Sequence, residues 1–70
     1  MPDTPAAHRF ESMVHGLIAT GHSVRGVARD AGVSAATISR AKLGESRAPS
    51  AETFHRVERV WKAAGEPSVK

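Results

Sequence analysis

Residues 23–40 read SVRGVARDAGVSAATISR, and this stretch decides the fold that the sequence predicts. Ser23 and Ser34 are favourable N-cap residues, and each precedes a short run whose apolar residues recur at helical spacing. Gly32 stands between the two runs and suits a helix end where the chain turns through positive φ. We therefore expect helices over residues 24–31 and 35–43, joined by a short turn.

Four residues have the sizes that such an elbow between helices requires. Ala28 is expected on its inside, where a larger side chain would hold the helices apart, and Gly32 allows the chain to reverse. Val33 fills the space beneath the turn, and Ile38 anchors the second helix in the core. The two helices should cross steeply, with the second presenting its outer side.

The rest of the chain also predicts helices. Residues 5–20 carry apolar residues at helical spacing before Gly21, and Ser50 begins a run with an apolar stripe that stops near Gly65. No stretch alternates apolar and polar residues as a strand would. The expected fold class is all-α, a small bundle of four helices with a fifth left open. Residues 1–70 form one domain, with 1–4 and 66–70 as flexible tails.

The positive charge is concentrated in the same segment. Among 70 residues the net charge is +3, and residues 24–47 hold five basic and two acidic residues, which accounts for all of it. A local positive charge favours a polyanionic partner. The basic residues of this segment are Arg25, Arg29, Arg40, Lys42 and Arg47.

Projecting residues 35–43 at about 100° per residue separates two sides of the expected helix. Thr37, Ile38 and Ala41 point inward. Arg40 points outward, where its guanidinium suits guanine O6 and N7, and alanine methyls suit thymine methyls. The residues expected to read bases are Ala35, Ala36, Ser39 and Arg40, and Leu43 shares their side.

Other residues are expected to contact phosphates. Ser23 and Ser34 lie at helix starts, where free N–H groups and the positive end of the helix dipole favour anions. Exposed cations of the segment add electrostatic contacts. The phosphate-contacting residues expected on these grounds are Ser23, Arg25, Ser34, Lys42 and Arg47, and the resemblance described next adds Thr37.

Residues 27–40, VARDAGVSAATISR, resemble the helix-turn-helix of the Cro/lambda-repressor-like (XRE) superfamily and of LacI-type repressors. Residues 49–54, PSAETF, are similar to the segment after the recognition helix in the XRE group. The resemblance implies a lambda-repressor-like helical bundle. Such a protein would be a cytoplasmic transcriptional regulator of bacterial or phage type, most simply a repressor, that binds a palindromic operator as a homodimer. It places Ala35, Ala36, Ser39 and Arg40 at base-reading positions and Thr37 and Lys42 nearer the backbone. Because the family often has glutamine, arginine or tyrosine in place of the two alanines, Arg40 and DNA shape should carry more of the specificity.

Several classes of function are disfavoured by composition. The chain has no cysteine, which excludes disulfides and thiolate metal sites, and no apolar run long enough to span a membrane. Its four histidines form no His-x-x-x-His pair, and no pattern arranges a nucleophile beside a base. We therefore expect no enzymatic activity, catalytic residue, metal, cofactor or small-molecule ligand.

Two other functions are compatible with the sequence. A small helical module could bind a partner protein through the last helix. In that helix Val60 and Trp61 either close the core of the monomer or form a candidate dimer seam. A directionality factor for a recombinase would bind DNA as a repressor does. Both alternatives therefore stay open beside repression.

Overall fold

The computed structural model describes residues 5–45 and 48–68, which form four α-helices and no strand within those ranges. The helices are α1 (Pro5–Ala19), α2 (Val24–Ala31), α3 (Ala35–Lys42) and α4 (Ala51–Ala63). The expected all-α bundle is confirmed, and the expected helix bounds agree to within about one residue for α1, α2 and α3. Residues 1–4, predicted as a tail, lie outside the described part of the chain.

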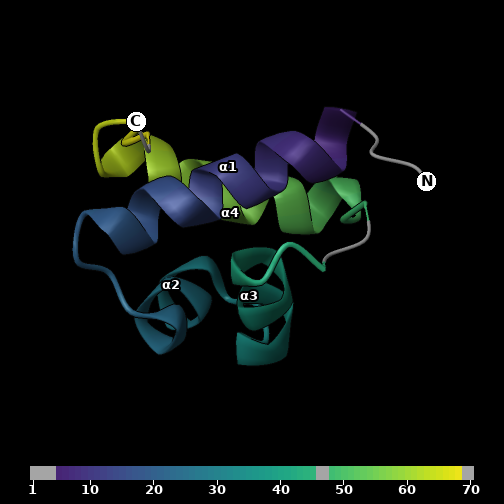
Figure 1. Cartoon of the computed structure of the whole chain (residues 1–70), viewed down its shortest axis with the longest axis horizontal. Coiled ribbons are helices and arrows are strands. Elements are labelled where there is room, and N and C mark those ends of the chain that lie inside the picture. The colour runs from purple at the N-terminus through teal and green to yellow at the C-terminus, as the bar shows by residue number, and fades with distance from the viewer. Residues whose placement is uncertain (1–4, 46–47, 69–70) are drawn as a thin grey trace.

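Two pairs of helices make up the bundle. Figure 1 shows α1 and α4 running along its long direction, with α2 and α3 on one side of them, and α3 crossing that direction steeply. Helix α3 packs against α1 and α2. It is therefore held from one side, and its other side is left for solvent.

The core is built from the inward positions of all four helices. Apolar residues spaced three or four apart share one face of a helix, and burying those faces removes apolar surface from water. Helix α1 supplies the most residues to this buried cluster and α4 the fewest. The fully packed members are Phe10, Met13, Val14, Leu17, Val27, Ala28, Ala31, Ile38, Ala41 and Val57.

Serine side chains begin three of the helices. The hydroxyl oxygens of Ser23, Ser34 and Ser50 accept hydrogen bonds from the N–H groups of Gly26 (2.9 Å), Thr37 (3.2 Å) and Thr53 (3.1 Å). Each bond satisfies a donor that has no partner inside its helix. The three caps expected from the sequence are thus present, and they fix where α2, α3 and α4 begin.

The turn between α2 and α3 depends on Gly32. Its φ of 73° and ψ of 33° place it in the left-handed region, which glycine adopts without steric cost. The Gly32 N–H donates to the Arg29 carbonyl (3.3 Å) and the Val33 N–H to the Ala28 carbonyl (3.0 Å), as in a Schellman motif. This geometry ends α2 and directs the chain into α3 within three residues.

The end of the described chain folds back on the bundle. The indole N–H of Trp61 donates to the Pro67 carbonyl oxygen at 2.7 Å. A Cβ atom added to Gly16 of α1 would lie 2.0 Å from the same oxygen, so only glycine allows this close approach. Residues 66–68 of the expected tail therefore lie against α1 and α4, while 69–70 are outside the described residues.

No helix in the described part of the chain combines the length and apolar character that crossing a bilayer requires.

Candidate nucleic-acid interface

Helix α3 has one buried side and one open side. Ile38 and Ala41 are fully buried, and Thr37 is partly buried, as the helical projection predicts. On the other side Ala35, Ala36 and Arg40 are exposed, whereas Ser39 is only partly exposed. The structure thus brings four expected base-reading residues onto one helix, and Ser39 is the least accessible of them.

The elbow residues occupy the positions expected for them. Ala28 is 4% exposed and Ile38 is 0% exposed, both within the main core cluster. Val33 is partly buried and packs against that cluster. With Gly32 in the left-handed region, these residues hold α3 across α2, and the outer side of α3 is left uncovered.

The polar residues at the starts of α2 and α3 are engaged in local hydrogen bonds, and Ser23 and Ser34 are exposed. Ser34 and Thr37 share a hydrogen bond between their hydroxyl oxygens (2.9 Å), in addition to the cap that Ser34 makes. Ser23 likewise caps α2. These hydroxyls are therefore held in place at the N-termini of α2 and α3, where the helix dipoles favour an anion.

Ion pairs divide the cations into two groups. On α1 and α4, Glu58 lies within 4.0 Å of Arg9, His55 and Lys62, and Arg56 binds Glu52 at 2.7 Å. On α2, Arg29 pairs with Asp30 at 3.7 Å. Within the described residues, no ion pair involves the following exposed cations: Arg25, Arg40, Lys42 and Arg59.

Three of these unpaired cations, Arg25, Arg40 and Lys42, lie on α2 and α3. Arg47, another expected phosphate contact, lies outside the described residues. Since acidic side chains compensate much of the positive charge on α1 and α4, the uncompensated charge is concentrated on α2 and α3.

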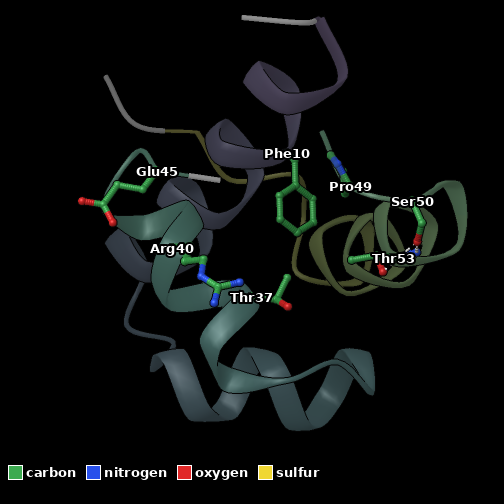
Figure 2. Close-up of a pocket in the computed structure, with 7 residues that line it drawn as sticks. All are labelled: Phe10, Thr37, Arg40, Glu45, Pro49, Ser50 and Thr53. Atoms are coloured by element: carbon green, nitrogen blue, oxygen red, sulfur yellow. Dashed lines mark hydrogen bonds between the residues drawn. The ribbon is translucent and has the colours of Figure 1, made fainter. Parts of the chain in front are cut away.

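A hollow of about 620 Å³ lies between α3 and the start of α4. Phe10 forms its inner wall, and Arg40 and Thr37 face Pro49, Ser50 and Thr53 across it (Figure 2). In the same view Glu45 points away from Arg40. The Arg40 guanidinium therefore has room to move at the border of the open side of α3.

The candidate dimer seam on α4 contributes to the monomer core. Val60 and Trp61 are each partly buried and pack against the core cluster. The Trp61 indole N–H already has an acceptor in Pro67. Both residues therefore have a role within one chain.

One contact at the interface was not expected from the sequence. The Nε2 atom of His15 on α1 lies 3.0 Å from the carbonyl oxygen of Lys42, the last residue of α3. The pair is separated by 27 residues, so no local pattern signals it.

Among the described residues, no three side chains of the metal-ligating types come together.

Comparisons with protein-family models, with curated proteins and with solved structures find no match to this chain. The resemblance to the Cro/lambda-repressor-like superfamily therefore rests on the residue pattern alone and stays a prediction.

Proposed function

We propose that this chain is a sequence-specific double-stranded DNA-binding protein that inserts α3 into the major groove. The observation that carries the proposal is the open side of α3. Ile38 and Ala41 bury the opposite side of the helix in the core, and Arg40 and Lys42 are cations on the same helix that have no ion pair among the described residues. An α-helix with its side chains is about 10–12 Å across, and the major groove of B-DNA is about 12 Å wide. The dimensions and the charge of this surface both suit a groove lined by phosphates.

Direct reading of bases would depend mainly on Arg40. Its guanidinium can donate two hydrogen bonds to guanine O6 and N7, which is the commonest specific contact in the major groove. Ala35 and Ala36 would add only methyl contacts. Ser39 is partly buried and its side chain is short, so it could contact only a DNA group that comes close to the helix. Specificity is therefore expected to be strongest at a G·C pair.

Phosphate contacts would come from both sides of α3. Arg25 on α2 and Lys42 at the end of α3 are exposed cations without an ion pair in the described part of the chain. The N-termini of α2 and α3, which begin at Val24 and Ala35, would add backbone N–H groups as further donors to phosphate. Such contacts position the protein on the duplex and make the affinity depend on salt.

The biological role that best fits this mode of binding is transcriptional regulation, most simply repression by a homodimer on a palindromic operator. Two recognition helices of such a dimer would lie about 34 Å apart, one turn of B-DNA. A recombination accessory factor would use the same surface. Mapping bound sites against promoters or recombination sites would separate the two roles.

The proposal is tested by selecting bound duplexes from a random library with the purified protein. An enriched motif supports sequence-specific binding, and an inverted repeat with half-sites about ten base pairs apart supports a dimer. A library that stays random at moderate salt would contradict the proposal. It would favour a protein-interaction role instead.

Arg40→Ala tests the assigned reader on the selected duplex. We expect a loss of about 1–3 kcal/mol on that duplex and a much smaller loss on random DNA. Arg59→Ala is the matched control, because Arg59 is an exposed arginine on α4 without an ion pair among the described residues. Equal losses on selected and random DNA would remove Arg40 as a base reader.

A further inference from the structure

Leu43 is a large apolar side chain that is exposed to water in the unbound protein, which is unfavourable. It is 65% exposed and is the one large hydrophobic side chain exposed among residues 5–45 and 48–68. It follows the last residue of α3 with helical φ and ψ of −85° and −2°, so the periodicity of the helix extends to it. Ala36 lies seven residues earlier, on nearly the same side at about 100° per residue.

Together Ala36 and Leu43 form the outer apolar stripe of α3. At 100° per residue this stripe points away from the buried pair Ile38 and Ala41, and Arg40 lies between its two members along the helix. The centre of the open side is therefore apolar, and the Arg40 side chain lies beside it.

The charge around Leu43 indicates what covers it. Arg40 and Lys42 are exposed and have no ion pair within the described residues. A second copy docking through the same surface would bring these cations against their own equivalents, which is electrostatically unfavourable. An anionic surface that also offers an apolar group fits both features.

We propose that Leu43 contacts the 5-methyl group of a pyrimidine in the major groove of DNA. This inference rests on the proposed function and adds to it a residue and a chemical group. The thymine methyl is the apolar group that a base presents in the major groove, and 5-methylcytosine presents the same methyl. Leu43 thereby contributes to specificity at a position that Arg40 does not read.

The spacing of the stripe predicts where that position lies. Seven residues of α-helix rise about 10.5 Å, and successive base pairs rise about 3.4 Å. If α3 lies along the groove, the methyl read by Leu43 is therefore about three base pairs from the base that Ala36 contacts.

The experiment uses the duplex selected with the full chain. Each thymine is replaced in turn by uracil, which removes only the methyl, and dissociation constants are measured by fluorescence anisotropy. A second set replaces each cytosine by 5-methylcytosine, which distinguishes the two sources of the methyl. At one thymine per half-site we expect uracil to weaken binding about three- to fivefold, the effect of losing one buried methyl group.

Variants of the protein test whether Leu43 causes the difference in affinity between the thymine and uracil duplexes. Leu43→Ala should bind the thymine and uracil duplexes equally, and Leu43→Met should keep most of the discrimination. Lys42→Ala is the control, since it should weaken both duplexes by the same factor. Because Leu43 is exposed, these variants should retain the helical circular dichroism spectrum of the wild-type protein.

Two results would overturn the assignment while leaving DNA binding intact. In the first, the wild-type protein binds every uracil and 5-methylcytosine duplex as it binds the parent. In the second, Leu43→Ala keeps the full discrimination of the wild-type protein. Failure to bind any duplex would instead overturn the proposed function together with this inference.

Discussion

The Nε2 atom of His15 and the carbonyl oxygen of Lys42 lie 3.0 Å apart, and this contact ties the end of α3 to α1. The last carbonyls of a helix have no partner within it. In α3, the Arg40 and Ala41 carbonyls accept from the N–H groups of Glu45 (2.8 Å) and Gly44 (3.2 Å). The Lys42 carbonyl is satisfied by a side chain instead. A ring nitrogen that donates to a carbonyl must carry a proton, so Nε2 is protonated when the bond forms.

Replacing His15 by alanine is expected to destabilise the fold. Loss of the bond leaves the Lys42 carbonyl without this donor, and a typical intramolecular hydrogen bond contributes about 0.5–1.5 kcal/mol. Urea unfolding measures the change. His8→Ala is the matched control, because His8 is exposed on the same helix and gains the same helix propensity on becoming alanine. Equal stabilities of the two variants would show that the contact contributes nothing.

Gly32→Ala is expected to destabilise the turn between α2 and α3. A left-handed conformation costs an L-residue with a side chain about 1–2 kcal/mol, and Gly32 has a φ of 73°. The new Cβ would also lie 2.9 Å from Nη1 of Arg56, a flexible group that can move aside. Gly32→Asn should cost less, since asparagine tolerates this conformation better. Urea unfolding that ranks asparagine at or below alanine would contradict the backbone explanation.

Local patterns predict this fold well because its decisive features are local. Ser34 and Gly44 bracket α3 in the sequence, and each acts within four residues of its position. The helical period also separates buried Ile38 from exposed Arg40. The helix ends and the buried and exposed sides of α3 depend only on residue spacing along one helix, which can be read from the sequence.

Features that depend on distance between elements could not be predicted in this way. The period gives the direction in which Ser39 points, but its partial burial depends on how closely the surrounding structure approaches it. The contact of His15 with Lys42 and the approach of Pro67 to Gly16 join residues far apart in the chain. Gly16 carries a weak signal in retrospect, since glycine inside a helix lowers stability unless another group comes close.

Gly16→Ala is expected to displace the end of the chain from α1. Alanine favours the helix by about 0.5–1 kcal/mol, but its Cβ would lie 2.0 Å from the Pro67 carbonyl oxygen, so that segment must move. Trp61 then loses the acceptor of its indole N–H. Because Trp61 is the one tryptophan of the chain, its fluorescence should shift to longer wavelength as water reaches it. Ser12→Ala, on the exposed side of α1, should leave the emission unchanged. An unshifted spectrum for Gly16→Ala would contradict the close packing.

The division of cations into paired and unpaired groups predicts a salt dependence. A cation that neutralises a DNA phosphate releases a counterion, so log K falls with log salt by about 0.9 for each such contact. Removing Arg25 or Lys42 should therefore lower affinity for selected and random duplexes alike and reduce the salt slope by about 1 each. Lys62→Ala is the control, since Lys62 lies on α4 and its Nζ is 4.0 Å from Glu58. Fluorescence anisotropy between about 50 and 200 mM salt gives the slopes. If Lys62→Ala changed the slope as much as Lys42→Ala, DNA would be held by the general positive charge of the protein and not by the α2–α3 surface.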